Sequence, residues 1–239
     1  LFSHGVADKV APCDQSRPVS SRRNSPGHVL FRRLPADRTI VCGICGVVAS
    51  GGVEHGILER MTRALTHRGP DGVGLWYSDS AAFGHRRLSI IDLAGGHQPM
   101  TSADGKIHLV FNGEIANFLA LRKSLEEKGY CFKTRSDTEV LLAAYECFGR
   151  ECVRHLCGMF AFAIYDERNG ELFLARDQAG IKPLLYWQKG DTLVFASEMV
   201  ALLKHPLVPR EIDPAAVSDY ISFQCVPGPQ SIFAGVRKL

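Results

Sequence analysis

Segments with the alternating pattern of β-strands fall into two groups in this chain, with two helix-like segments between them. The clearest hairpin is residues 163–175, AIYDERNGELFLA, where Asn169-Gly170 separates two apolar stretches and tolerates the positive φ of a tight turn. Hairpins join antiparallel neighbours, whereas a parallel doubly wound sheet requires a regular alternation of strands and helices. We therefore expect an α+β protein whose antiparallel sheets carry helices on their outer faces.

Apolar residues at helical spacing predict three helices. In residues 54–67 these are Ile57, Leu58, Met61 and Leu65, which would share one face. The other two helices are expected around 116–128 and 136–148, and strands at 42–49, 73–78, 81–91, 106–112, 159–167, 171–177, 184–188 and 192–197.

Residues 1–41 differ in composition from the rest of the chain. They hold seven Lys and Arg residues against three Asp, whereas the remaining residues carry 21 basic and 22 acidic groups. Because the segment contains prolines and no sustained period of a helix or strand, we expect a disordered basic leader. It is upstream sequence translated from a mis-called start codon, a pro-segment that is removed, or a transit peptide, for which Arg and Ser with few acids are typical.

The composition argues against several classes of function. The near-neutral charge of residues 42–239 gives no electrostatic support for a nucleic-acid partner, and no glycine-rich phosphate-binding loop is present in the sequence. The longest clean apolar run, residues 159–165, is far shorter than the roughly 20 residues that cross a membrane, so no membrane partner is expected. The eight cysteines have no repeated spacing and several lie in apolar patterns, which favours reduced thiols in a cytoplasmic protein.

Cys42 and Cys45 are spaced like a metal or redox pair, in the apolar segment CGICGVVA. A structural zinc site needs four ligands, and the sequence has no second C-x-x-C. A thioredoxin-like motif would start a helix at its second cysteine, but strand-like residues continue through Val48. A strand would place the two sulfurs on opposite faces. Taken alone, the segment leaves a metal or redox pair, buried structural thiols and a nucleophilic Cys42 open.

A series of short motifs follows this segment in a characteristic order. Each motif is weak alone, but the ordered set is specific. Over residues 42–239 the set resembles the glutaminase domain of class II glutamine amidotransferases, and most closely that of glutamine-hydrolysing asparagine synthetases. The motifs are CGICG (42–46), HRGPDGVG (67–74), GHRRLSIIDL (84–93), QPM (98–100), FNGEIAN (111–117), RSDTEVLL (135–142), GMFAFAIYD (158–166), LARDQAGIKPLLY (174–186) and FASEMVALL (195–203).

This resemblance implies an architecture and a set of partners. It implies an N-terminal nucleophile hydrolase, a four-layer αββα sandwich of two antiparallel sheets between helices. The glutaminase domain would span 42–205, and 206–239 would be a linker leading toward a missing synthetase domain. No metal and no cofactor are expected in this fragment, whereas ATP and Mg belong to the synthetase domain. The partners would be L-glutamine and the synthetase that receives ammonia, and a homodimer is one option for the full-length protein.

The resemblance also implies the chemistry. Cys42 would be the nucleophile, and its own α-amine the general base, because an α-amine has a pKa of ~7.7–8.0 and can accept the thiol proton. The thiolate would attack the side-chain amide of glutamine, and a thioester and ammonia would form before water releases glutamate. While Val41 remains attached, the nitrogen of Cys42 is an amide that cannot accept a proton. The active protein is therefore expected to begin at Cys42.

Further site residues follow by resemblance, each beside a plainer interpretation. Asn112 and Gly113 would form the oxyanion hole, although Asn-Gly alone indicates a hairpin turn. Arg87 would bind the α-carboxylate of glutamine, although it could be a solvated strand residue. Asp137 would pair with the α-ammonium, although an aspartate at a helix start, within a Ser136–Glu139 capping box, needs no ligand.

The remaining implied residues surround these. Glu114, Leu88 and Ile90 would line the glutamine pocket, the last two through their backbone. Arg68 and Asp71 would organise the loop around the nucleophile. The family usually has Tyr where Ala116 stands, which affects the pocket edge or a domain contact but no catalytic group. A non-catalytic glutamine-binding or scaffold domain, which a retained leader and Ala116 would favour, stays as the alternative function.

Overall fold

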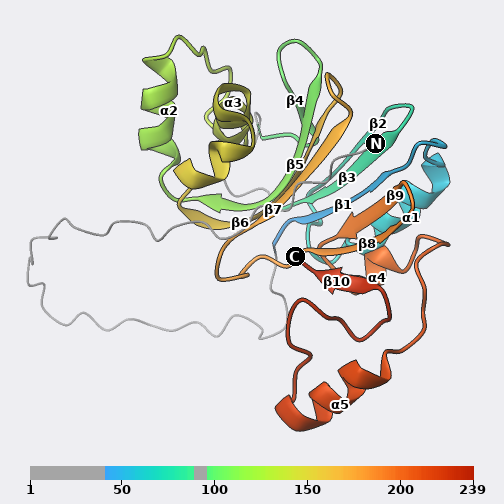
Figure 1. The fold of residues 1–239 in the computed structure, drawn as a ribbon. Helices are drawn as coiled ribbons and strands as arrows, with labels where there is room; N and C mark the ends of the chain where they lie inside the picture. Colours follow the sequence, from blue (N-terminus) through green and yellow to red (C-terminus); the bar gives the residue numbers. More distant parts are fainter. Residues whose placement is uncertain (1–40, 89–95) are drawn as a thin grey trace, which may run out of the picture.

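The computed structural model of the protein describes residues 41–88 and 96–239, so the predicted leader up to residue 40 and the predicted site residue Ile90 lie outside the described residues. Within the described ranges, the strands form two antiparallel sheets that stack face to face (Figure 1). The strand order is β10-β8-β9-β1-β3-β2 in the six-stranded sheet and β4-β5-β6-β7 in the four-stranded sheet.

The elements have the following bounds. The six-stranded sheet contains β1 (Gly43–Val48), β2 (Gly72–Tyr77), β3 (Ala81–Arg87), β8 (Leu185–Lys189), β9 (Thr192–Ala196) and β10 (Val236–Lys238). The four-stranded sheet contains β4 (Met100–Thr101), β5 (Ile107–Ile115), β6 (Gly158–Asp166) and β7 (Glu171–Arg176). The helices are α1 (His55–Ala64), α2 (Phe118–Glu126), α3 (Asp137–Phe148), the 3-10 helix η1 (Gly149–His155), α4 (Met199–Leu202) and α5 (Pro214–Phe223).

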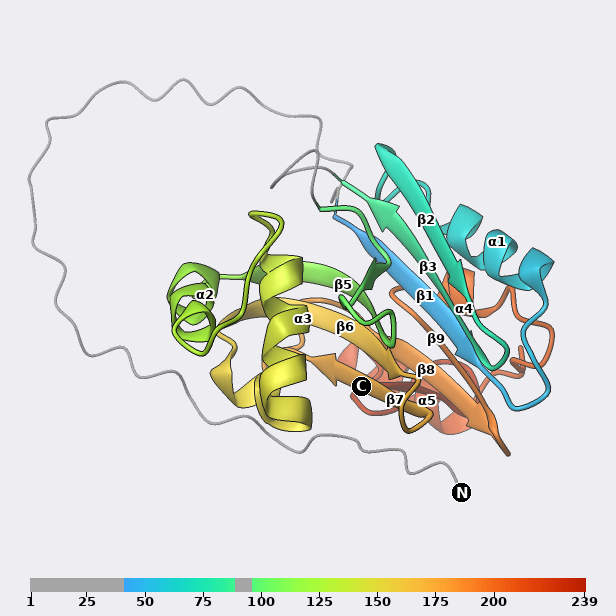
Figure 2. The ribbon, with the colours of Figure 1, turned by 90° about the horizontal axis from the view of Figure 1, so that it is seen from above.

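The sheets and helices form four layers. Side chains such as Ile44, Phe83, Val110 and Phe195 fill the space between the two sheets. The helices α1 and α4 pack on the outer face of the six-stranded sheet, and α2 and α3 pack on the outer face of the four-stranded sheet (Figure 2). The predicted α+β class and the αββα order of layers are confirmed.

Most predicted elements are present close to their expected positions. Helix α1 buries Ile57, Leu58 and Met61 as its apolar spacing indicates, and Leu65, which follows its last residue, is buried with them. The hairpin between β6 and β7 is formed, and its turn residue Gly170 has a φ of 69°. The strands β4 and β10 were not predicted, because two or three residues are too few to show an alternating pattern.

Residues 206–239, predicted to be a linker, contain both an attached and a protruding part. Strand β10 pairs with β8, with Val236 opposite Trp187, and thereby extends the six-stranded sheet. Helix α5 extends away from the sheets (Figure 1) and, of its ten residues, buries Ala216. No helix of the described chain is long and apolar enough to cross a membrane.

The side chains of Cys42 and Cys45 diverge, as predicted. Ile44 points between the sheets, whereas Cys45 points toward α1, where its sulfur lies 3.4 Å from the Thr62 hydroxyl oxygen. Burial raises the pKa of the Cys45 thiol to about 12, so this thiol is unreactive at neutral pH. Cys42 precedes β1 and lies in a different environment, which is described below.

Asn112 and Gly113 lie inside β5, so the hairpin-turn interpretation of this pair is wrong. Asn112 is opposite Ala161 and Gly113 is opposite Phe160 of β6. A Cβ atom at Gly113 would lie 2.2 Å from the carbonyl oxygen of Met159. The glycine is therefore required by the close approach of two strands, where no turn is formed.

We predict that Gly113→Ala destabilises the fold, because the added methyl group meets backbone atoms that cannot move aside. The expected loss is about 1–3 kcal/mol in the free energy of unfolding, as for overpacking of a core. Calorimetric unfolding measures it. Gly51→Ala is the matched control, since its Cβ meets nothing within 4 Å, and it should change stability by less than about 0.5 kcal/mol. Equal stabilities of the two variants would contradict this account of Gly113.

Candidate active site

A cavity of about 110 Å³ lies where the ends of several strands meet the start of α3. Most of the predicted site residues line it. Cys42 comes from the segment before β1, Arg87 and Leu88 from the end of β3, and Asp137 from the first turn of α3. Together with the β5 residues, the predicted site residues that line the cavity are Cys42, Arg87, Leu88, Asn112, Gly113, Glu114 and Asp137.

The thiol of Cys42 lies against the backbone of Leu88. The Leu88 N–H donates to the Cys42 sulfur at 3.3 Å, and the sulfur lies 3.6 Å from the Leu88 carbonyl oxygen. Burial raises the pKa of the Cys42 thiol above its ordinary value, although the Leu88 N–H and the cations of Arg87, Arg68 and Lys182 oppose this shift. The thiol is therefore protonated at neutral pH and needs a base before it can attack.

Arg68 fixes the backbone of Cys42. Its Nε donates to the Cys42 carbonyl oxygen at 3.0 Å, and its Nη1 donates to Glu198 Oε1 at 2.7 Å. Glu198 also contacts His67 Nε2 at 2.8 Å through its other oxygen. Asp71 contacts the end of β3, where its backbone N–H donates to the Arg87 carbonyl oxygen at 3.0 Å. Of the two residues predicted to organise this loop, Arg68 contacts Cys42 directly and Asp71 contacts the end of β3.

Asn112 presents an unused hydrogen-bond donor at the cavity that Cys42 also lines. Its side chain is 1% exposed and lines the cavity, and its Nδ2 has no partner among the residues that the structure describes. Leaving such a buried donor unpaired costs roughly 1–3 kcal/mol. An oxygen atom of a bound molecule would remove that cost.

Gly113 presents a second donor at the same cavity. The N–H and the carbonyl of Phe160, which faces Gly113, both bond to Asp177 on the other side of β6. The Gly113–Phe160 pair is therefore a non-hydrogen-bonded pair, and the Gly113 N–H points away from β6. The neighbouring N–H groups at Phe111 and Ile115 follow the same alternation and point to the same edge of β5.

Two buried side chains of opposite charge complete the cavity. Arg87 is 8% exposed and Asp137 is 6% exposed. Burial raises the pKa of the Asp137 carboxyl group, and the charge of Glu114 adds to this shift, whereas backbone N–H groups including that of Ile115 lower it. A cation near Asp137 would relieve its burial, so the cavity is suited to a molecule that carries one positive and one negative group.

The start of α3 is only partly the predicted capping box. Ser136 Oγ accepts from the Glu139 N–H at 3.3 Å, as predicted. The Glu139 carboxylate accepts instead from the N–H groups of Lys133 and Thr134, at 2.8 and 2.6 Å. It therefore fixes the loop that leads to Asp137.

A model of the glutamine amidotransferase domain family matches residues 41–239. The chain belongs to this family. Asparagine synthetase (glutamine-hydrolyzing) 1 of Bacillus subtilis is 42% identical over 206 residues, which cover 83% of this chain and 32% of the relative. A putative asparagine synthetase (glutamine-hydrolyzing) of Mycobacterium tuberculosis is 40% identical and is covered over 34% of its length. This chain thus spans about a third of the length of these relatives.

Solved structures with this fold include another amidotransferase. Glutamine phosphoribosylpyrophosphate amidotransferase from B. subtilis, in complex with ADP and GMP, matches with a TM-score of 0.57 and 27% identity. The match covers 67% of this chain and 42% of that chain. The predicted family is therefore confirmed, and the two stacked sheets of the amidotransferase domain agree with those of a solved member.

Gln98 and Lys182 are among the further residues that line the cavity and that the sequence motifs gave no role. Both lie within the quoted motifs, but in loops, where no periodicity marks a functional side chain. The Lys182 loop is held by Asp177, whose carboxylate accepts from the N–H groups of Ile181 and Lys182, both at 2.9 Å. The positive charge of Lys182 acts on the Cys42 thiol.

A metal site was not predicted for this domain. In residues 41–88 and 96–239, no group of three or more His, Cys, Asp and Glu residues could hold a metal ion. Cys42 and Cys45 do not approach a common ligand position, because one sulfur faces Leu88 and the other faces Thr62.

Proposed function

We propose that this amidotransferase domain hydrolyses L-glutamine to glutamate and ammonia. The observation that carries the proposal is one cavity that is lined both by Cys42 and by Asn112, whose buried amide nitrogen has no hydrogen-bond partner among the described residues. A nucleophile beside an unused donor is the arrangement required for attack on a carbonyl group. The family to which the chain belongs supports glutamine as the substrate.

Arg87 and Asp137 would orient the substrate. The planar Arg87 guanidinium suits the α-carboxylate, which it can bind through two parallel hydrogen bonds. The Asp137 carboxylate suits the α-ammonium. Glutamine held by both groups would direct its side-chain amide toward Cys42, and an amine without the α-carboxylate would bind weakly.

The reaction would proceed through a thioester. The thiolate of Cys42 attacks the amide carbon, and the carbonyl electrons move to the oxygen, which accepts from Asn112 Nδ2 and the Gly113 N–H. Collapse of this intermediate breaks the C–N bond, and the departing nitrogen takes up the thiol proton and leaves as ammonia. Water then attacks the thioester, which restores the thiol and releases glutamate.

The base is proposed to be the α-amine of Cys42. With Val41 attached, this nitrogen belongs to a peptide bond, and Val41 itself lines the cavity. General-base catalysis typically contributes ~10²–10⁴-fold to the rate. We therefore propose that the active form begins at Cys42, whether the leader is removed or is never translated.

The nucleophile is tested with proteins that begin at Cys42 or at Val41. The form that begins at Cys42 should release glutamate and ammonia from glutamine, and the form that retains Val41 should be about 10²–10⁴-fold slower. For the form that begins at Cys42, kcat/KM should rise with pH up to about 8, because the α-amine must lose a proton to act as base. Glutamate release followed at several pH values, with intact mass to verify each N-terminus, gives the comparison.

The two cysteines provide the control for that test. Cys42→Ala should abolish hydrolysis, whereas Cys45→Ser should retain most of it, because Cys45 faces α1. Loss of activity on Cys45→Ser in a stably folded protein would contradict the assignment. If every form binds glutamine by calorimetry and none hydrolyses it, the domain is a glutamine-binding module.

The oxyanion role of Asn112 makes a separate prediction. Asn112→Ala should lower kcat by about 10²–10³-fold and change KM little, because the donor acts on charge that develops in the transition state. Steady-state kinetics on the form that begins at Cys42 measures both constants. Asn169→Ala, in the exposed β6–β7 turn, is the matched control and should leave both unchanged. A rise in KM with an unchanged kcat would overturn the oxyanion role.

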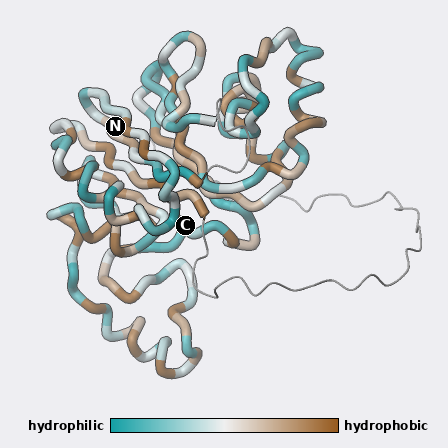
Figure 3. Tube along the Cα trace, turned by 180° about the vertical axis from the view of Figure 1, so that it is seen from behind, coloured by the Kyte–Doolittle hydropathy of each residue, from teal (hydrophilic) through white to brown (hydrophobic). Residues whose placement is uncertain are grey.

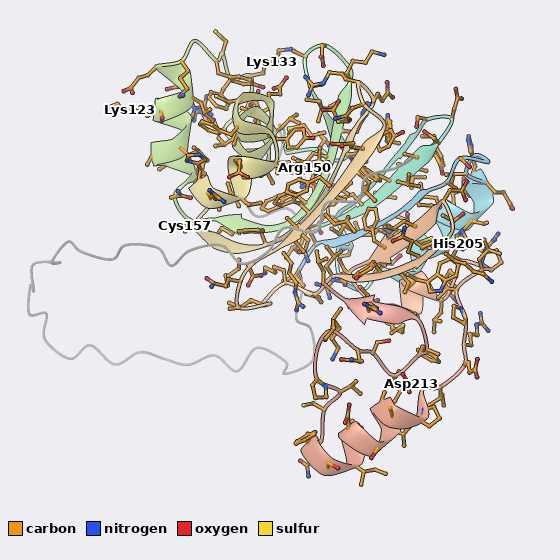
Figure 4. The ribbon with its side chains drawn as sticks, viewed as in Figure 1. Lys123, Lys133, Arg150, Cys157, His205 and Asp213 are labelled. Carbon is orange, nitrogen blue, oxygen red and sulfur yellow. The ribbon has the colours of Figure 1, made fainter. Side chains whose placement is uncertain are left out.

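We also propose that the ammonia is used by a synthetase domain that covers α5. The chain spans about a third of relatives named asparagine synthetases, which makes aspartate the proposed acceptor. Helix α5 is capped by Asp213, whose carboxylate accepts from the Ala215 N–H (Figure 4). It exposes 76% of Ile221 and 65% of Phe223, on a protruding segment with many hydrophobic residues (Figure 3). A ten-residue helix is marginal in water without packing, which favours a covering domain.

The full-length protein tests the acceptor and the docking face together. With aspartate, ATP, Mg²⁺ and glutamine labelled with ¹⁵N at the amide, the label should appear in asparagine. The double variant Ile221→Glu/Phe223→Glu should lower this transfer several-fold and retain synthesis from free ammonium, because a loosened interface lets ammonia escape. Leu119→Glu on α2, which is 68% exposed, is the control. If no asparagine forms, aspartate is not the acceptor, and unlabelled asparagine would refute the use of ammonia from glutamine. Equal transfer by both variants would refute the docking face.

A further inference from the structure

The edge of β5 that faces the cavity has side-chain partners where a neighbouring strand would normally lie. Strand β4 pairs with β5 only at Met100–Leu109 and Thr101–His108. Continued in register, residue 98 would stand opposite Phe111, but the strand pairing ends at Met100. The Gln98 side chain takes that position instead, and its Oε1 accepts from the Phe111 N–H at 2.6 Å.

A second side chain occupies the same edge four residues further along. Asp137 Oδ2 accepts from the Ile115 N–H at 3.2 Å. Between these two bonded groups lies the N–H of Gly113, which points to the same edge and lines the cavity. The direction of the Gly113 N–H is therefore set by one fixed group on each side.

Gln98 also connects the edge of β5 to the start of α3. Its Nε2 donates to Thr138 Oγ1 at 3.4 Å, and Thr138 follows Asp137 in the first turn of α3. Its backbone is packed against the other sheet, since a Cβ atom at Gly74 of β2 would lie 1.8 Å from the Gln98 carbonyl oxygen. Gln98 thus contacts β5, α3 and the six-stranded sheet at the rim of one cavity.

We propose that Gln98 is a positioning residue that aims the β5 donors, the Gly113 N–H and the Asn112 amide, at the oxygen of the reacting amide. It does so without touching the reacting atoms, because its two hydrogen bonds go to Phe111 and Thr138. The inference rests on the proposed hydrolysis of glutamine. If the two donors no longer point at this oxygen, the transition state loses more stabilisation than the bound substrate does.

The test compares Gln98→Met with the parent, both beginning at Cys42. Methionine keeps the length of the side chain and removes both hydrogen bonds. We expect kcat to fall about 10-fold and KM to change less than about 3-fold, as for one misplaced hydrogen-bond donor. Gln188→Met, on the exposed part of β8, is the matched control and should leave both constants unchanged.

A second measurement reports on the donors without catalysis. Amide hydrogen exchange followed by NMR should become about 10-fold faster at Phe111 and at Gly113 in Gln98→Met, and should stay unchanged in β7. Faster exchange at Phe111 with an unchanged kcat would show that the bond only stabilises the strand edge, and would overturn the proposal. So would a fall in kcat with unchanged exchange at Gly113.

The same pair of measurements separates this inference from the proposed function. If the parent does not hydrolyse glutamine, the proposed function fails. Exchange at Gly113 then still decides whether Gln98 positions the β5 donors, and unchanged exchange refutes it. Thr138→Val, which removes only the Nε2 partner, should reproduce part of the loss in kcat, whereas Thr138→Ser should retain parent kinetics.

Discussion

The candidate site depends on one mismatch in strand length, between β4 with its two residues and β5 with its nine. Past Leu109, no strand of the described residues lies beside the outer edge of β5, and every second N–H along that edge must find another partner. Gln98 satisfies Phe111, and Asp137 satisfies Ile115. The intervening N–H of Gly113 is then directed into the cavity. An unpaired strand edge, usually a site of aggregation, becomes an oriented set of hydrogen-bond donors.

The stacking of the two sheets explains why charged groups from different layers meet at the cavity beside this edge. Arg87 ends β3 of one sheet and Asp137 starts the helix that packs on the other, so the charges converge although their elements lie in different layers. Both side chains are buried, where electrostatic interactions are stronger than in water. The cost of burying them is reduced by local partners, which for Asp137 are backbone N–H groups. Such a cavity favours a ligand with one group of each charge over a neutral molecule of the same size.

The sequence predicts the elements whose pattern is local and long enough to repeat. Helix α1 and the β6–β7 hairpin are of this kind, because burial in them follows a regular period. Asn112-Gly113 is not, since the pair has the signature of a turn while Gly113 is required by the Met159 carbonyl of a neighbouring strand. The ordered motifs identified the family, and through it Cys42, Arg87, Asn112 and Asp137. They gave no role to Gln98, because its partners Phe111 and Thr138 are distant in sequence. The hydrogen bond to Phe111 forms because β4 stops pairing with β5 before that residue.

The contacts of Cys42 also determine what removal of the preceding residues would change. The structure holds Cys42 through its carbonyl oxygen, bonded to Arg68, and through its sulfur, which lies against Leu88. Neither contact uses the nitrogen that becomes the free amine in the proposed active form. The architecture of the site is therefore compatible with a chain that still carries Val41, and the thiol with its raised pKa remains protonated in that chain. Release of the amine would add a base to a site whose donors are already in place. On this view, the change from inactive to active requires no refolding, because it converts a single amide nitrogen into an amine.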